Sequence, residues 1–308
     1  MRIVVSGALG HIGSSLIRQL PSSFETAQII MIDDLSTQRY CSLFNLSGQG
    51  RYQFIEGKIQ SLNLDAIFQG ADAVIHLAAL TDAAGTADKP ELVHQNNFES
   101  TKAVADACLR VRLPLLFPSS TSVYGSQSQL VDETCEDLQP QSPYAACKIK
   151  EETYIQELSQ KGLKAVICRF GTIYGVSPGM RFHTAVNKFC WQAVMNQPVT
   201  VWETALHQKR PYLALEDCSN AISWILKKEL YDGSTYNIVS NNFTVQNVID
   251  EIKKHISSLR VQFVQHKIMN QLSYEVSSQK FSRTGFEFKG NLSTGIEDTI
   301  TLLKNANE

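Results

Sequence analysis

The chain begins with a strand-like run, Arg2-Ile-Val-Val-Ser6, which leads directly into Gly7-Ala-Leu-Gly10-His-Ile-Gly13. Three glycines at this spacing allow a tight turn and leave backbone N–H groups free at the start of a following helix. We expect that helix over Ser14 to Leu20, ended by Pro21. A strand, a glycine-rich turn and a helix in this order are typical of a site for the phosphates of a dinucleotide.

A second signal for a dinucleotide lies about 20 residues beyond Gly13, where Asp33 follows the apolar run Gln28 to Ile32. A carboxylate at the end of the second strand hydrogen-bonds an adenosine ribose in such folds. Asp33 and Asp34 together would repel a 2′-phosphate, which favours NAD over NADP. Arg39 lies nearby and leaves NADP open.

Further along the chain, short apolar runs alternate with helix-length segments. Each run is apolar almost throughout, as a parallel sheet requires when helices cover both of its faces. The runs are Ile3–Ser6, Gln28–Ile32, Tyr52–Ile55, Ala73–Leu77, Leu113–Phe117 and Ala165–Arg169, and the longest helical segments are Glu91–Arg110 and Pro143–Lys161. The sequence therefore predicts an α/β protein with a Rossmann-like, doubly wound parallel sheet.

The alternation weakens after Gly175, where Val176-Ser-Pro-Gly-Met180 is typical of a loop and an amphipathic segment follows near Thr184 to Asn196. We expect residues 1–175 to form an NAD-binding domain to which later segments return. We expect residues 176–308 to form mostly a smaller, mixed α/β lobe that covers the substrate.

The composition excludes several classes of protein. The chain has 308 residues, 43% of them hydrophobic, and a net charge of −2, which argues against disorder and gives no basic surface for nucleic acid or an anionic membrane. Its apolar runs are far shorter than the ~20 residues that span a bilayer, and no apolar signal region follows Met1. The seven cysteines are scattered and contain no C-x-x-C pair. We expect a cytoplasmic protein with reduced thiols and no metal site.

A candidate catalytic pair lies in Gln141-Ser-Pro-Tyr-Ala-Ala-Cys-Lys148. Ser142 and Pro143 are typical of the start of a helix, so Tyr144 and Lys148 fall one turn apart on one face. A phenol has a pKa near 10, so a tyrosine base at neutral pH needs an ammonium group such as that of Lys148 nearby. An isolated pair of this kind is more often a packed tyrosine beside a surface lysine.

A hydroxyl-rich segment, Pro118-Ser-Ser-Thr-Ser-Val-Tyr-Gly125, follows the strand that ends at Phe117. It offers hydroxyls at the carboxyl edge of the predicted sheet, where they could orient a substrate hydroxyl. Such strand ends are also common as plain turns. The glycine turn, this segment and the Tyr144–Lys148 pair in this order are much more specific than any one of them.

With these motifs, the chain resembles the extended short-chain dehydrogenase/reductase family, in its NAD-dependent nucleotide-sugar epimerase/dehydratase branch. The resemblance covers nearly the whole length, and further segments carry it: Gly57-Lys-Ile59, His76-Leu-Ala-Ala79, Asn96 to Thr101, Arg169 to Gly175 and Lys209 to Asp217. It implies bound NAD, a nucleotide-diphosphate sugar as substrate, and a homodimer formed through Glu91–Arg110 and Pro143–Lys161.

The resemblance also implies roles for individual residues. Ser120, Tyr144 and Lys148 correspond to the catalytic set. The residues implied to bind the cofactor are Gly7, Gly10, His11, Ile12, Gly13, Asp33, Asp34, Lys58, Ile59, Leu77, Ala78, Ala79, Asn97, Tyr144, Lys148 and Phe170. Those implied to bind the substrate are Thr81, Ser120, Thr121, Thr172, Asn187, Arg210 and Lys267.

Departures from the family pattern concern the type of reaction and the recognition of the nucleotide bases of cofactor and substrate. Lys58 stands where an aspartate usually meets the adenine, and Thr172 replaces a frequent asparagine. The 4,6-dehydratases carry an Asp-Glu pair after the catalytic Thr, whereas this chain has Thr121-Ser122. We therefore favour epimerisation at C4. A nucleotide-sugar dehydrogenase or 4-ketoreductase, a dehydratase, and a non-catalytic dinucleotide sensor or scaffold are the alternatives.

Two further expectations concern residues outside the motifs. His76 ends a predicted strand and is expected to be a hydrogen-bonded core histidine. The acidic residues Asp132-Glu133 and Glu136-Asp137 are expected to form a solvated loop.

Overall fold

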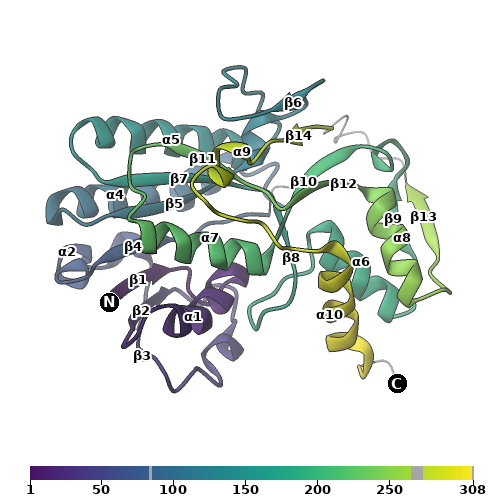
Figure 1. Ribbon diagram of the computed structural model, residues 1–308, viewed down its shortest axis with the longest axis horizontal. Helices are drawn as coiled ribbons and strands as arrows, with labels where there is room; N and C mark the ends of the chain where they lie inside the picture. Colours follow the sequence, from purple (N-terminus) through teal and green to yellow (C-terminus); the bar gives the residue numbers. More distant parts are fainter. Residues whose placement is uncertain (83–84, 265–272, 307–308) are drawn as a thin grey trace.

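A seven-stranded parallel sheet lies at the centre of the larger part of the molecule in the computed structural model, which describes residues 1–82, 85–264 and 273–306 (Figure 1). The strand order is β11-β7-β5-β4-β1-β2-β3. The bounds are β1 Arg2–Ser6, β2 Gln28–Asp33, β3 Arg51–Glu56, β4 Ala73–His76, β5 Leu115–Ser120, β7 Ala165–Phe170 and β11 Thr235–Ile238. The predicted α/β, doubly wound architecture is confirmed.

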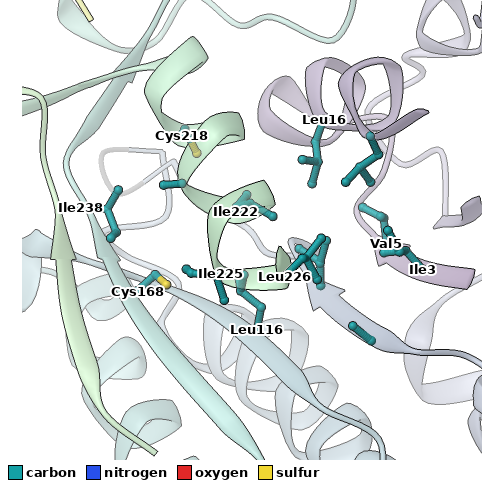
Figure 2. Close-up of a cluster of buried hydrophobic side chains, with 14 of the residues drawn as sticks. Ile3, Val5, Leu16, Leu116, Cys168, Cys218, Ile222, Ile225, Leu226 and Ile238 are labelled. Carbon is teal, nitrogen blue, oxygen red and sulfur yellow. The ribbon is translucent and has the colours of Figure 1, made fainter. Parts of the chain in front are cut away.

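Both faces of this sheet are apolar and covered by helices. Ile3 and Val5 of β1 pack into one hydrophobic cluster, and Val4 between them packs into the other. The helices are α1 His11–Ser23 and α7 Leu215–Lys228 on one side, and α2 Leu64–Phe68, α4 Glu99–Val111 and α5 Pro143–Gln160 on the other. Figure 2 shows α7 side chains facing Leu116 and Cys168 of the sheet.

Two helix predictions need correction. α1 does not end at Pro21 but runs to Ser23. Proline removes one helix N–H and so frees the carbonyl of Ile17, which instead accepts a hydrogen bond from the hydroxyl of Tyr52 at 3.3 Å. The predicted helix Glu91–Arg110 is interrupted, with α3 at Pro90–Val93 and a wider π-helical turn at His94–Phe98 before α4.

The smaller sheets and most of the remaining helices form a lobe at one end of the large sheet (Figure 1). A three-stranded sheet has the order β12-β10-β8, and β13 pairs with β9. The bounds are β8 Thr172–Tyr174, α6 Ala185–Val194, β9 Val199–Trp202, β10 Lys209–Ala214, β12 Asn241–Thr244, α8 Val245–His255, β13 Val261–Val264 and α10 Leu292–Lys304. α7 and β11 also follow residue 175, but they belong to the layers of the large sheet.

Shorter elements complete the described chain. β6 Leu130–Val131 pairs with β14 Glu275–Val276, and α9 spans Gln279–Ser282. Single 3₁₀ turns lie at Tyr40–Leu43, Ile59–Ser61, Thr121–Tyr124 and Glu203–Ala205. Within the described residues, no helix is both long and apolar enough to cross a membrane.

The strand order reverses between β1 and β4, because β2 and β3 extend from β1 in one direction and β5, β7 and β11 extend from β4 in the other. At such a switch point the loops that follow the two strands diverge and leave a crevice at the carboxyl edge of the sheet. The loop Gly7 to Gly13 follows β1, and Leu77 to Thr81 follow β4. The fold therefore brings these two motifs together.

The predicted core histidine is confirmed, and the prediction of a solvated acidic loop is wrong at one residue. Nδ1 of buried His76 lies 2.7 Å from the hydroxyl of Ser6, and burial lowers the pKa of His76 to about 3. Glu133 is half-buried, because its carboxylate accepts the backbone N–H of Asn237 at 2.6 Å. This contact ties the acidic segment to β11.

We expect His76 to make the protein less stable in mild acid. The unfolded chain protonates this histidine below a pH of about 6.5 and the folded chain only near 3, so the free energy of unfolding falls as the pH is lowered between these values. His76→Gln should be less stable than the wild type at pH 7 but lose less stability between pH 7 and pH 5. Urea unfolding at both pH values measures this, with the exposed His207→Gln as control. An equal loss in wild type and His76→Gln would contradict the prediction.

Candidate functional site

Two of the three glycines after β1 are required by close packing. Gly7 has φ +66°, and a Cβ there would lie 2.6 Å from the backbone nitrogen of Ala78. A Cβ on Gly13 would lie 2.4 Å from the carbonyl oxygen of Gly7. At Gly10 the nearest atom to a Cβ would be 3.3 Å away, so a side chain there would be the least crowded of the three. The loop is therefore pressed against the segment after β4 and against the start of α1.

The N-terminus of α1 fits an anionic group. Gly10 precedes the helix and supplies no side-chain cap, and the first turn, which begins at His11, contains no acidic residue. The first backbone N–H groups of a helix have no partner within it, and the helix dipole favours negative charge at this end. A pyrophosphate satisfies both conditions.

A cavity of about 690 Å³ lies beside this helix end, within the size range of small-molecule sites. Both sides of the switch point contribute to its lining. The predicted site residues that line it are Gly7, Gly10, His11, Ile12, Gly13, Asp33, Asp34, Lys58, Ile59, Leu77, Ala78, Ala79 and Thr81. Thirteen of the residues that the family resemblance implied for the site thus line one cavity.

Asp33 is held in place at the end of β2. Its carboxylate oxygens accept the backbone N–H groups of Leu9 at 3.1 Å and Leu35 at 3.0 Å. Burial raises the pKa of Asp33, and these two hydrogen bonds oppose that shift. Asp34 differs, because its carboxylate accepts the N–H of Ser36 at the exposed surface. Asp33 is thus the better fixed of the two carboxylates.

Asn97 supports the cavity from behind. Its side-chain oxygen accepts the N–H of Leu80 at 2.7 Å, and its amide donates to the carbonyl of Leu80 at 2.9 Å. The residue is fully buried in the π-helical turn. Asn97 therefore fixes the loop that carries the cavity residues Leu77 to Ala79.

The three predicted catalytic residues meet at the carboxyl edge of the sheet. Ser142 caps α5 by accepting the N–H of Ala145 at 3.1 Å, which puts Tyr144 in the first turn of the helix. Tyr144 is hydrogen-bonded to Ser120, the last residue of β5. The ammonium nitrogen of Lys148 lies 5.8 Å from the centre of the Tyr144 ring.

The pKa of Tyr144 reflects opposing effects. Burial is the largest of them and raises the pKa. The positive charges of Lys148 and Arg181 and the hydrogen bond to Ser120 lower it, and the carboxylate of Glu151 raises it. Lys148 acts in the predicted direction, but in the protein alone burial outweighs it and the pKa of Tyr144 stays above its ordinary value.

Arg181 links the cavity to the catalytic residues, and sequence reasoning missed it. It lines the cavity, donates a hydrogen bond to the hydroxyl of Thr81 and acts electrostatically on Tyr144. Burial lowers its pKa to about 10, so the guanidinium stays charged at neutral pH. Within the described residues it has no ion-pair partner, and its Nε has no hydrogen-bond partner. An anionic ligand would supply the missing counter-charge.

The loop that carries Arg181 is fastened to the start of α1. Nδ1 of His11 lies 2.8 Å from the hydroxyl of Ser177, and the N–H of Gly179 donates to the hydroxyl of Ser14 at 2.9 Å. No periodic pattern marks residues in such a loop, so nothing in the sequence singled out Arg181.

The predicted substrate residues occupy different surroundings. The hydroxyl of Thr121 donates to the carbonyl of Phe170 at 3.3 Å and lies 3.5 Å from the hydroxyl of Tyr274. Phe170 itself, which was predicted to contact the cofactor, is the buried last residue of β7. Nε of Arg210, on β10, is buried without a hydrogen-bond partner among the described residues.

Three predicted substrate residues remain. One hydrogen-bonds to the backbone of a loop, one lies on a strand, and one lies outside the described residues. Asn187 is fully buried and bonds to the backbone of Gly175, so it supports the loop that leads to Arg181. Thr172 lies on β8 opposite Tyr212. Lys267 lies outside the described residues.

Comparison with known proteins identifies the family. The model of the NAD dependent epimerase/dehydratase family matches residues 3–239. The uncharacterized UDP-glucose epimerase YtcB of Bacillus subtilis (strain 168) is 30% identical over 250 residues, which cover 77% of this chain and 76% of that protein. A dTDP-D-glucose 4,6-dehydratase of Dictyostelium discoideum is 29% identical, covering 83% of this chain and 62% of that protein.

Among solved structures, a UDP-glucuronic acid 4-epimerase from Bacillus cereus in complex with NAD is similar over 99% of this chain and 100% of its own, with a TM-score of 0.87 and 26% identity. The chain therefore belongs to the NAD-dependent epimerase/dehydratase family.

We expect Asp33→Ala to weaken NAD binding about ten- to hundredfold, because each hydrogen bond that a charged carboxylate accepts from a ribose hydroxyl is worth roughly 1.5–3 kcal/mol. The preference for NAD over NADP should also relax. Asp34→Ala is the matched control and should lose much less, since its carboxylate is bound at the surface. Calorimetric titration with NAD and NADP, after any copurified dinucleotide has been removed, measures the effect. Equal NAD affinity in Asp33→Ala and the wild type would contradict the role of Asp33.

Proposed function

We propose that this chain is an NAD-dependent nucleotide-sugar epimerase that acts at C4. The observation that carries the proposal is the meeting of Ser120, Tyr144 and Lys148 beside a cavity with the features of a dinucleotide site. Arg181 and Thr81 connect the two regions. Family membership supports the same conclusion.

The residues divide the chemistry among them. When bound, NAD supplies the acceptor and later the donor of a hydride at the sugar carbon. Tyr144 takes the proton of the sugar hydroxyl as that carbon is oxidised, and returns it when the carbon is reduced. Ser120 hydrogen-bonds the same oxygen, and the charge of Lys148 favours the ionised form of Tyr144. The reaction is an epimerisation when the keto sugar rotates between the two hydride transfers, so that the hydride returns to the opposite face of the same carbon.

The residues after Ser120 support epimerisation over dehydration. Elimination of water needs an acid for the leaving hydroxyl and a base at the neighbouring carbon. Thr121 and Ser122 carry only hydroxyl groups, and the hydroxyl of Ser122 donates to that of Ser120 at 2.9 Å. Neither residue can serve as a carboxylic acid.

We propose a UDP sugar as the substrate, since the names of two relatives specify UDP-glucose and UDP-glucuronic acid. Arg181, which is half-buried, would meet an anionic group of the bound ligands, either a phosphate or a sugar carboxylate. Turnover of UDP-glucose, UDP-N-acetylglucosamine and UDP-glucuronic acid, followed by NMR, would identify the sugar.

We expect Tyr144→Phe to reduce turnover of the preferred sugar at least about a hundredfold, because proton transfer by a positioned side chain contributes factors of that order. Product formation is measured with the same three sugars. NAD should still copurify with the variant and with the wild type, since an epimerase reoxidises its own cofactor and does not need to release it. Near-normal turnover by the Tyr144→Phe variant would exclude Tyr144 as the catalytic base.

Two other outcomes would favour the alternative reactions. Accumulation of a 4-keto-6-deoxy sugar would identify a dehydratase. Protein that loses its cofactor on desalting and turns over only with added dinucleotide would identify a dehydrogenase or a 4-ketoreductase.

We further propose a cytoplasmic homodimer that forms through the outer faces of α4 and α5. The hydroxyl of Tyr154 on α5 donates to Asp106 on α4 at 2.6 Å, so the two helices present one joined surface. Equilibrium sedimentation of the full chain should give twice 34.3 kDa. A mass of 34.3 kDa would contradict the dimer.

A further inference from the structure

Lys148 contacts a buried carboxylate that the proposed chemistry does not use. Glu151 lies three residues further along α5 and is fully buried. One of its oxygens lies 3.0 Å from the ammonium nitrogen of Lys148. The other accepts a hydrogen bond from the hydroxyl of Thr101 on α4 at 2.6 Å. The carboxylate is thus fixed between two helices and against the catalytic lysine.

The surroundings of Lys148 would otherwise disfavour its charge. Only 4% of its side chain is exposed. Its ammonium donates to the carbonyl of Pro118 at 3.1 Å and lies 4.4 Å from the centre of the Phe117 ring. Neither of these groups carries a full negative charge. A lysine buried in this way can lose its proton several pH units below its ordinary pKa.

The other titratable groups near Lys148 do not replace Glu151 as a counter-charge. His76, from β4, is neutral because burial lowers its pKa to about 3. Cys147 is a neutral thiol with a pKa raised to about 11, and Tyr144 is a neutral phenol at rest. Arg181 faces Tyr144 with a second positive charge. Within the described chain, Glu151 is the only carboxylate in ion-pair contact with Lys148.

The effect of Glu151 reaches Tyr144 through Lys148. Burial has the largest single effect and lowers the pKa of Lys148. The charge and hydrogen bond of Glu151, together with smaller effects of Tyr144 and Cys147, outweigh it, and the pKa of Lys148 lies above its ordinary value. Acting directly on Tyr144, Glu151 opposes ionisation, but the effect of Lys148 is the larger of the two. The pair as a whole therefore favours the ionised form of Tyr144, provided that Lys148 keeps its proton.

The neighbouring Glu152 has a different partner. Its carboxylate forms an ion pair with Arg169 at 2.7 Å and accepts a hydrogen bond from the hydroxyl of Ser119. It is also buried, and it lies on the same helix. Glu152 is therefore a matched control for removal of a buried carboxylate from α5.

We propose that Glu151 is a positioning residue that keeps the buried Lys148 as an ammonium ion and thereby supports proton transfer by Tyr144. The part of this inference that concerns Tyr144 rests on the proposed function. The protonation of Lys148 does not, because it can be measured without turnover.

Glu151→Gln tests the inference, since it keeps the size of the side chain and removes its charge. The readout is the pH titration of the Lys148 ε-carbon by NMR of the full chain with ¹³C-labelled lysine, the signal being assigned with Lys148→Arg. In the wild type we expect the midpoint to lie above the ordinary range of a lysine. In Glu151→Gln we expect the midpoint to fall by at least about one pH unit. Glu152→Gln should titrate like the wild type.

The pH dependence of kcat should change in the same direction. Activity of Glu151→Gln should decline at a lower alkaline pH than activity of the wild type, because Lys148 loses its proton earlier. Glu151→Asp keeps the charge, so its activity should decline at nearly the same alkaline pH as that of the wild type. This decline is the alkaline limb of the pH profile. A change in folding alone would lower kcat at every pH without moving this limb.

An unchanged Lys148 midpoint in folded Glu151→Gln would overturn the inference. If that variant does not fold, Glu151→Ser with the same NMR readout replaces it, and an unchanged midpoint there has the same meaning. A shifted midpoint in a protein that turns over none of the three UDP sugars would refute the proposed UDP-sugar substrate and leave the effect of Glu151 on Lys148 intact.

Discussion

The close approach of α1 to the turn after β1 is the constraint on which the rest of the site depends. Gly13 packs so tightly against the carbonyl of Gly7 that a Cβ would be only 2.4 Å away. This contact holds the N-terminus of α1 at the carboxyl edge of the sheet, where the strand order reverses. The free N–H groups of the helix, the carboxylate of Asp33 and the segment after β4 consequently border one cavity.

The fold was largely predictable because both sheet faces are buried. The inner strands are then apolar almost throughout, although the edge strand β3 has no fully buried residue, and all six predicted strands lie in the large sheet. The continuation of α1 beyond Pro21 was not predictable. The carbonyl of Ile17, which the proline leaves free, accepts a hydrogen bond from Tyr52, and Tyr52 lies far away in the sequence. The contact of Glu133 with β11 was not predicted either, because its partner Asn237 is also distant in the sequence.

The site was predictable wherever a motif fixes the backbone. The glycine turn, the end of β2 and the first turn of α5 bring their residues to the expected places. Arg181 lies in an irregular loop, where no spacing reveals which way a side chain points. Glu151 did leave a signal, because residues three apart on a helix are neighbours, but only the structure shows that this face of α5 is buried.

The loop before α6 has a consequence for exchanging parts between relatives. A Cβ on Gly179 would lie 2.2 Å from the carbonyl oxygen of Leu9, and Ser177 and Gly179 also bond to side chains of α1. The loop before the smaller lobe and the first helix thus share a set of contacts that neither segment specifies alone. A chimaera joined at residue 176 would separate them, so an exchange of sugar specificity must carry the loop and its α1 contacts together as one module.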